Sequence, residues 1–241
     1  MIAEEKPSHL IQPGRKIIVA IDGPAGAGKS TVARHIAEHF GLMNLETGAM
    51  YRAFALKALR AELPLDDGNA LKLLADETTI RLEPGDENNR VLLDGEDVTG
   101  MLRNQTVTEA ASRVSVFPPV RAWMVRLQQQ LASQGGVVME GRDIGTVVFP
   151  HADVKIFLDA APEVRGLRRF DQLGPKSTQQ PEEVIRDLRA RDARDRNRAE
   201  SPLKAADDAV VLDSTEMTLD QVVQAADAIV AARLAEPARH S

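Results

Sequence analysis

Residues 23–31 read Gly23-Pro24-Ala25-Gly26-Ala27-Gly28-Lys29-Ser30-Thr31. An apolar, β-branched run at 17–21 precedes them, and Val32, Ile36 and Phe40 follow at the spacing of a helix. Strand, glycine loop and helix form the context that the pattern G-x-x-x-x-G-K-[ST] requires. Glycines let the loop curl so that successive N–H groups point at one anion, and the helix N-terminus adds partial positive charge. The sequence therefore predicts a phosphate-binding loop; the alternative is a glycine-rich turn with a surface lysine.

All nine residues of this loop are candidate nucleotide-binding residues, and two of their side chains have predicted roles. Lys29 supplies a point charge to the phosphates. Ser30 offers its hydroxyl to a Mg²⁺ ion that bridges the β- and γ-phosphates. Ser30 is thus the predicted metal-binding residue.

Composition excludes several classes of protein. The chain has 241 residues, of which 43% are apolar and 27% charged, as in an ordinary globular protein. A net charge of −6 and an aromatic content of 3% argue against nucleic-acid binding. The absence of cysteine excludes disulfides and thiolate zinc sites, and it is compatible with a reducing cytoplasm. No apolar run approaches the about 18 residues of a membrane helix, and residues 1–15 lack the apolar core of a signal peptide.

The fold class follows from how strands and helices alternate. Four more apolar runs predict strands at 42–45, 137–139, 154–158 and 209–212. Helical patterns predict helices at 49–56, 67–76, 107–116, 120–134, 164–173 and 182–198, and a final helix that ends at 234. Strands separated by helices imply an α/β protein with a five-stranded parallel sheet and helices on both faces.

Residues 65–104 have a different pattern. Residues 79–83 alternate like a half-buried strand, and 84–89 predict a loop. Asp94-Gly95, between two short apolar runs, predicts a two-residue hairpin. We therefore expect a small antiparallel insertion here, preceded by a helix that Thr47 caps.

Because ligands gather at the carboxyl ends of parallel strands, the chemistry is expected on residues that follow strands. Arg142 and Asp143 follow the strand at 137–139 and can face the group that receives a phosphate; the alternative is a surface ion pair. Asp159 follows the strand at 154–158 and either orients the waters of magnesium or caps the next helix.

A helix rich in arginine is the third candidate. Residues 186–198 hold six arginines and three aspartates, and Arg191, Asp195 and Arg198 fall on one helix face. The alternative is a solvated, salt-bridged helix. The Gly174-Pro175 break before it suits a mobile lid whose guanidinium groups bridge two phosphates.

Four segments together resemble the bacterial cytidylate kinases. They are the phosphate loop, Thr47-Gly48-Ala49-Met50-Tyr51-Arg52, Gly141-Arg142-Asp143-Ile144-Gly145-Thr146-Val147-Val148-Phe149-Pro150, and Arg191-Asp192-Ala193-Arg194-Asp195-Arg196-Asn197-Arg198. The resemblance runs from about residue 17 to about residue 234. It implies transfer of the γ-phosphoryl group of ATP to CMP or dCMP, with magnesium. We further expect a cytoplasmic monomer whose partners are these small molecules, not nucleic acid or a membrane.

The resemblance also implies a domain organisation of the P-loop NTPase type. It predicts a leader at 1–15, core at 16–64, an NMP-binding insertion at 65–104, core at 105–164, a lid at 165–200, and core with the last helix at 201–241.

Site residues carried over by position complete the prediction. They place Thr47 near the CMP phosphate; Ser112, Arg121 and Asp143 around cytosine; Arg142, Arg191 and Arg198 at the phosphates; and Asp195 at the ribose. Taken alone, Ser112 and Arg121 are more typical of structural roles. Lys29 and the three phosphate arginines form the predicted catalytic set. Glu46-Thr47 replaces the Asp-Ser common in the family but keeps the hydroxyl, and Ser30 stands where some members have Gly. Adenine is expected between Arg168 and residues 213–215.

Three other functions remain as alternatives. A P-loop kinase for another small acceptor, such as shikimate, gluconate or a different nucleotide, would share the loop and the sheet. A regulatory NTPase switch would share the loop, although the sequence has no N-K-x-D string. A non-enzymatic RNA-binding protein could use the arginine-rich helix, against the acidic net charge.

Overall fold

The computed structural model describes residues 16–83, 85, 89–174 and 179–235. The predicted leader at 1–15, the tail from 236, Pro175 and most of the loop at 84–89 lie outside these residues. Two compact units divide the chain. The first unit is Met1–Met43 with Gln134–Ser241, and the second unit is Asn44–Ser133, which contains the predicted insertion. The boundaries predicted for the insertion and the lid stay predictions.

A five-stranded parallel sheet is the centre of the fold; four of its strands belong to the first unit, and the fifth, β2, begins at Met43 and continues into residues 44–46 of the second unit. Its strand order is β2-β6-β1-β7-β8. The strands are β1 (Ile18–Asp22), β2 (Met43–Glu46), β6 (Val137–Gly141), β7 (Val154–Asp159) and β8 (Val210–Asp213). Strand β1 runs parallel to both β6 and β7, and β7 runs parallel to β8. The predicted five-stranded parallel sheet is therefore confirmed.

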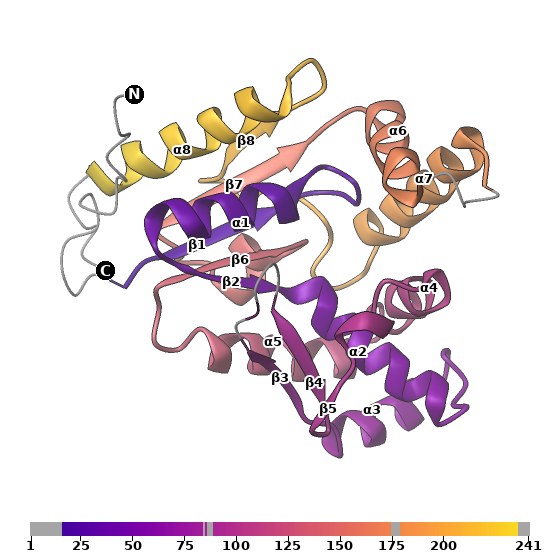
Figure 1. Cartoon of the computed structure of the whole chain (residues 1–241). Helices are drawn as coiled ribbons and strands as arrows, with labels where there is room; N and C mark the ends of the chain where they lie inside the picture. Colours follow the sequence, from indigo (N-terminus) through magenta and orange to yellow (C-terminus); the bar gives the residue numbers. More distant parts are fainter. Residues whose placement is uncertain (1–15, 84, 86–88, 175–178, 236–241) are drawn as a thin grey trace. The chain divides into compact units, whose positions relative to one another are not determined.

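Two helices cover one face of this sheet. Helix α1 (Lys29–Phe40) buries Val32, Ile36 and Phe40, the apolar positions spaced by four in the sequence. Helix α8 (Leu219–Ala235) packs beside α1 and buries Val222 and Val230 in the same apolar core (Figure 1). This packing fixes the first residue of α1, and with it the end of the phosphate loop, against the sheet.

Two further helices and a short irregular one lie near the strand ends. Helices α6 (Pro162–Leu173) and α7 (Pro181–Arg196) pack against each other at Gly166, where an added Cβ would lie 2.2 Å from Ile185 Cγ1. The sequence predicted that the second of these helices reaches Arg198, but α7 ends two residues earlier, so that prediction was wrong. The segment η3 (Ile144–Val148) is one turn of π-helix packed against β1 and β6, which no sequence pattern indicated.

The second unit combines four helices with a small antiparallel sheet. The helices are α2 (Thr47–Arg60), α3 (Gly68–Asp76), α4 (Gln105–Val114) and α5 (Pro118–Leu131), with a 3₁₀ turn η2 (Thr99–Met101). The strands β3 (Ile80–Glu83), β4 (Arg90–Leu93) and β5 (Glu96–Asp97) are antiparallel neighbours in that order. Asp94 and Gly95 both have positive φ, 50° and 91°, as the predicted two-residue turn requires.

Helix α2 corrects one prediction. Glu46, not Thr47, occupies the position before the first helical residue, and it makes no side-chain capping bond. Thr47 is itself the first residue of α2, and it is buried. Among the helices within the described residues, none is long and apolar enough to cross a membrane.

Candidate active site

The phosphate loop follows β1 at the carboxyl end of the sheet, as the sequence predicted. Gly23 allows the loop to approach β7 closely, because a Cβ there would lie 1.9 Å from the carbonyl oxygen of Leu158. Gly28 precedes α1 with φ 95°, a conformation that favours glycine. Its carbonyl accepts hydrogen bonds from the N–H groups of Thr31 and Val32 at 3.1 Å each. The loop thus ends at the N-terminus of α1, which favours a bound anion.

Lys29 is the buried cation of this loop. Its residue is only 6% exposed, and its Nζ donates a 2.7 Å hydrogen bond to the carbonyl oxygen of Pro24. Burial, followed by the charges of Arg142 and Arg191, lowers the pKa of Lys29 to about 7, although Glu140 and Asp22 act in the other direction. Cations gathered in this way favour a bound anion, which would stabilise all of them together.

Asp22, the last residue of β1, holds the segment after β6 in place. Its two carboxylate oxygens accept hydrogen bonds from the N–H groups of Ile144 and Gly145, at 2.8 and 2.7 Å. These bonds fix the start of η3 next to the phosphate loop. Burial raises the pKa of Asp22 to about 6, against the lowering effect of the two N–H groups. Sequence analysis missed this residue, although an acidic residue at the end of an apolar strand was a usable signal.

The predicted phosphate and ribose residues of the first unit form one charged group. Arg142 Nε donates a 3.0 Å hydrogen bond to Asp195 Oδ2, and Arg198 Nη1 lies 3.9 Å from Asp195 Oδ1. Burial raises the pKa of Asp195, but the positive charges of Arg142, Arg191 and Arg198 outweigh it and lower the pKa below its ordinary value. Arg198 lies beyond the end of α7. Its side chain is held there by a 2.6 Å hydrogen bond that Nη2 donates to the carbonyl oxygen of Ser201. The structure therefore brings these four predicted residues together, with Lys29 close enough to interact electrostatically.

Arg165 is a buried residue that sequence analysis did not select as a site residue. Its side chain is 2% exposed and forms a 2.6 Å ion pair with Asp192 of α7. The same guanidinium donates hydrogen bonds to the carbonyl oxygens of Ala25 and Ala160, at 2.8 and 2.7 Å. Arg165 thus links the phosphate loop, the end of β7 and helix α7.

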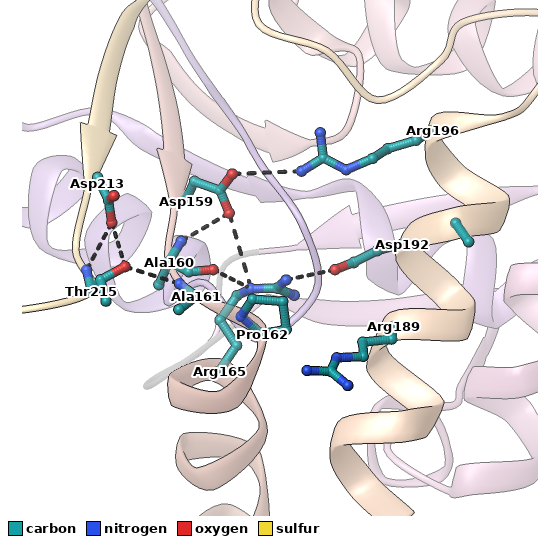
Figure 2. A pocket seen from close by; sticks show the side chains of 11 residues that line it. Asp159, Ala160, Ala161, Pro162, Arg165, Arg189, Asp192, Arg196, Asp213 and Thr215 are labelled. Carbon is teal, nitrogen blue, oxygen red and sulfur yellow. Dashed lines mark hydrogen bonds and ion pairs between the residues drawn. The ribbon is translucent and has the colours of Figure 1, made fainter.

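A cavity of about 510 Å³ lies beside Arg165, between the ends of β7 and β8 and one face of α7 (Figure 2). Asp213 and Thr215 line it, from the loop in which adenine was expected. Arg168 donates to the hydroxyl and the carbonyl oxygen of Ser214 in that loop, at 3.1 and 2.9 Å. The two segments named for the adenine pocket are therefore neighbours.

Asp159 lies in the wall of this cavity. It accepts from the N–H of Ala160 and lies 3.5 Å from Arg196 and 4.0 Å from Arg165 (Figure 2). The residue before α6 is Ala161, which has no side-chain capping bond, so the prediction that Asp159 caps this helix was wrong.

Three of the remaining predicted residues belong to the second unit. Thr47, Ser112 and Arg121 are all buried there, between 3% and 4% exposed. Ser115 connects the last two, because its hydroxyl donates to the carbonyl oxygen of Ser112 and its own carbonyl accepts from Arg121 Nη1 at 3.2 Å. The Cζ atom of Arg121 also lies 6.0 Å from the ring centroid of Tyr51. Sequence analysis missed Ser115, which gives no signal because its contact with Arg121 uses a backbone oxygen.

Asp143 completes the predicted set. It lies at the corner between β6 and η3 and is 6% exposed. Its carbonyl oxygen accepts from the N–H groups of Val147 and Val148, and its negative charge contributes to the raised pKa of Asp22. The structure therefore fixes the backbone of Asp143 firmly next to Asp22.

A phosphate loop on a parallel sheet, with buried cations beyond its lysine, defines a P-loop nucleotide-binding protein. The family model of cytidylate kinase matches residues 19–232. The cytidylate kinase of Pasteurella multocida is 46% identical over 209 residues, which cover 86% of this chain and 92% of the relative. That of Syntrophotalea carbinolica is 47% identical over 220 residues, covering 91% and 94%. The chain belongs to the cytidylate kinase family of phosphotransferases.

Among solved structures, the chain is similar to shikimate kinase from Acinetobacter baumannii, with 17% sequence identity. The match covers 97% of this chain and 100% of that chain. Its TM-score to this chain is 0.45.

Proposed function

We propose that this chain transfers the γ-phosphoryl group of ATP to CMP or dCMP, giving ADP and CDP or dCDP. The single observation that carries the proposal is the phosphate loop at the N-terminus of α1, with Lys29 buried in it, 6% exposed, and subject to the charges of Arg142 and Arg191. A phosphoryl group in transfer carries negative charge, which the positive charges of Lys29, Arg142 and Arg191 would stabilise. Family membership supports the choice of cytidine monophosphates as acceptors.

The loop at 23–31 binds the phosphates of ATP. The N–H groups of its first turn and the Lys29 ammonium hold the β- and γ-phosphates at the N-terminus of α1. Arg165 supports this loop through the carbonyl oxygen of Ala25 without touching a phosphate. The cavity beside Asp213 and Thr215 accepts the adenine base.

The acceptor residues match the chemistry of cytosine. Its exocyclic amine is a donor and its ring offers two acceptors, so a carboxylate such as Asp143 and a guanidinium such as Arg121 complement it, with Ser112 as a further partner. Thr47 binds the phosphate of CMP through its hydroxyl. Asp195 orients Arg142 and binds the ribose.

Three arginines bridge the two phosphates during transfer. Arg142, Arg191 and Arg198 neutralise charge on the transferring group and align it with the acceptor oxygen. The reaction needs no general base, because the phosphate of CMP has a second pKa of about 6 and is mostly a dianion at neutral pH. Closure of the segment at 165–200 excludes water, which would otherwise accept the phosphoryl group.

Magnesium fits the residues at the start of α1. Ser30 is exposed on the first turn of the helix, and its hydroxyl makes no hydrogen bond within the described residues, so it is free to act as a ligand. An oxygen ligand of this type suits Mg²⁺, which keeps its other positions for phosphate oxygens and water. Bound there, the ion would neutralise charge on the phosphates of ATP.

Other features of the proposal rest on composition and on the family. The protein acts as a cytoplasmic monomer without nucleic-acid or membrane partners. The alternative is a P-loop kinase for a different small acceptor, which would keep the ATP site and lose the need for Asp143 beside a base.

The test is a steady-state phosphoryl-transfer assay with Mg-ATP and CMP, dCMP, UMP, AMP or shikimate, in which ADP and the phosphorylated product are both measured. CMP and dCMP should lead, and UMP should be slower by up to about 10⁴-fold, because uracil presents an acceptor where cytosine has its amine. Asp143→Asn should lower the ratio of CMP turnover to UMP turnover. The control Asp76→Asn, on an exposed part of α3, should leave that ratio unchanged. Comparable turnover of UMP and CMP by the unmodified chain would reject the proposal.

A further inference from the structure

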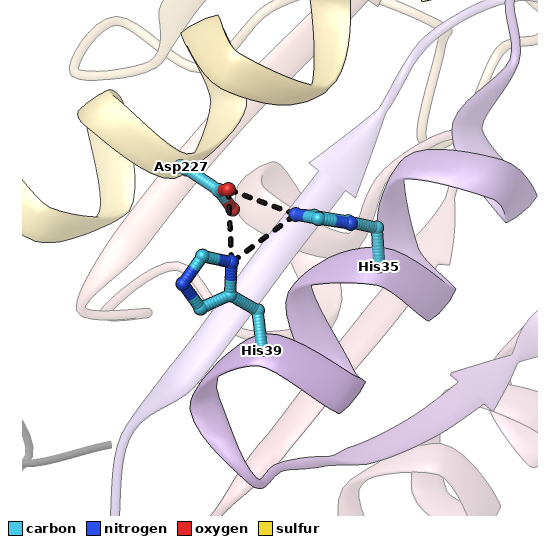
Figure 3. A group of neighbouring side chains, drawn as sticks. All are labelled: His35, His39 and Asp227. Carbon is cyan, nitrogen blue, oxygen red and sulfur yellow. Dashed lines mark hydrogen bonds and ion pairs between the residues drawn. The ribbon is translucent and has the colours of Figure 1, made fainter. Parts of the chain in front are cut away.

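Two histidines of α1 and one aspartate of α8 form a cluster of side chains of the types that bind metal ions. His35 and His39 are four residues apart on α1, so both rings lie on the same face of that helix. Asp227 projects toward them from α8 (Figure 3). The three side chains are partly exposed, at 35%, 28% and 21% in that order, and therefore remain accessible to a solute.

Three atoms of this cluster converge on one point. His35 Nε2 lies 2.8 Å from Asp227 Oδ2, His39 Nδ1 lies 3.0 Å from the same oxygen, and the two nitrogens are 3.3 Å apart. The ring of His39 stacks on buried Phe40, with centroids 5.0 Å apart, which restricts its orientation. The convergence therefore involves ring positions that are already restricted by packing.

No placement of protons on the two rings makes all three of these contacts hydrogen bonds at once. If both nitrogens carry protons and donate to Asp227, the contact between the two nitrogens joins two donors. If His39 donates to His35, then His35 Nε2 carries no proton for Asp227. The other carboxylate oxygen, Asp227 Oδ1, is buried and has no hydrogen-bond partner within the described part of the chain. One cation would satisfy the three converging atoms at once and lie next to this second oxygen.

The separations suit a small transition-metal ion. Ligand bonds of about 2.0–2.2 Å in a tetrahedron place the ligand atoms about 3.4 Å apart. The observed separations, 2.8 to 3.3 Å, need to open by only about half an ångström, which partly exposed side chains permit. Two imidazoles and one carboxylate favour Zn²⁺ over Mg²⁺ or Ca²⁺, which prefer oxygen ligands.

We propose that His35, His39 and Asp227 bind one Zn²⁺ ion, with water in the remaining position. The ion joins α8 to α1, the helix whose first residue is Lys29 of the phosphate loop. Its role is to hold the last helix against the sheet rather than to take part in phosphoryl transfer. The site is independent of the function proposed above.

The test is a Zn²⁺ titration of the full chain after treatment with a chelator, by calorimetry, with millimolar Mg²⁺ present throughout. One equivalent should bind. Zn²⁺ at about 100 times Kd should raise the Tm by about 5–10 °C. Co²⁺ in place of Zn²⁺ should give the visible absorption of a four-coordinate ion.

Variants of the three ligands assign the binding to this cluster. His35→Ala, His39→Ala and Asp227→Ala should each weaken binding by more than the about 10–100-fold that loss of an outer hydrogen-bond partner costs. His39→Gln and Asp227→Asn, which keep side-chain volume, serve if an alanine variant fails to fold as judged by circular dichroism. His151→Ala and Asp220→Asn are matched controls, because both residues are exposed and lie outside the cluster. Equal Zn²⁺ affinity in the ligand variants and the controls, or no binding by the unmodified chain, would overturn the proposal.

Discussion

Arg165 in the first unit differs from Arg60 and Arg90 in the second unit in how its charge is paired. In the first unit, the Arg165 side chain is 2% exposed, and it bonds to Asp192 and to two backbone carbonyls. In the second unit, Arg60 and Arg90 are 41% and 53% exposed, and they pair with the exposed carboxylates of Glu96 and Asp97. Both arrangements contain short ion pairs, at 2.6 Å for Arg165, 2.6 Å for Arg60 and 3.0 Å for Arg90.

Burial, not distance, sets the value of these pairs. Exposed pairs gain little because water screens their charges, whereas removal of one member of a buried pair leaves a charge without solvent or partner. Arg165 lies next to the phosphate loop and holds it through the carbonyl oxygen of Ala25. We therefore expect a large effect from loss of the Arg165 pair and small effects from loss of the Arg60 and Arg90 pairs.

The largest expected effect is that of Asp192→Ala. Loss of the partner of Arg165 should cost about 3–5 kcal/mol, and a chain of this length should lose roughly 6–20 °C in Tm. Thermal unfolding followed by circular dichroism measures it. The double variant Arg165→Met with Asp192→Leu is the control, because apolar residues of similar volume should restore much of the stability. A Tm shift below that expected for an exposed pair would contradict the comparison.

Lys29→Met separates catalysis from stability. The variant should lower kcat by about 10²–10³-fold, because one charge that stabilises the transferring phosphoryl group is lost. The Tm should change little, since the buried ammonium is already unfavourable, as its lowered pKa indicates. Steady-state kinetics and thermal unfolding on the same sample measure both. A large loss of Tm with normal kcat would assign Lys29 a purely structural role.

The lowered pKa of Lys29 also predicts proton uptake on nucleotide binding. The pKa is about 7 in the folded chain and 10.5 in the reference state, so the unfolded chain binds more protons between those values. For this group, stability therefore rises with pH across that window. Phosphates favour the charged ammonium, so Mg-ATP binding at pH 8 should take up nearly one proton, and much less at pH 6. Calorimetry in buffers of different ionisation enthalpy measures the uptake, and Lys29→Met should abolish it.

Arg60→Ala tests the exposed side of the comparison and has the smallest expected effect. Loss of its pair with Glu96 should change the Tm by less than about 4 °C. Added salt should shrink the difference between the variant and the parent chain, because the charges are exposed. A shift as large as that of Asp192→Ala would show that burial does not decide the value of these pairs.

Local signals made much of the fold predictable. The glycines of residues 23–28 and the turn at Asp94-Gly95 encode backbone conformations directly, and both were found at the predicted positions. The core positions of α1 followed from their spacing of four. Each of these features depends on residues close together in the sequence.

The remaining features depend on contacts between distant residues. The π-helix of η3 starts at N–H groups held by Asp22, 122 residues earlier in the chain. Arg165 is buried because it meets Asp192 and the carbonyl oxygen of Ala25, and no pattern within α6 indicates this. The position of Arg198 beyond the end of α7 likewise depends on Ser201 and on Asp195. Helical spacing alone therefore gave the correct neighbours for Arg198 but the wrong helix end.

The measurement that most directly tests the central claim is kcat for Arg191→Ala with CMP, together with the Kd for ATP and the Tm of the same variant. The account predicts that kcat falls by at least about 10²-fold, while the Kd for ATP rises only a few-fold and the Tm stays within a few degrees. Such a result would show that this arginine acts on the transferring group. A near-normal kcat would contradict the claim that the cations around Lys29 are gathered for phosphoryl transfer.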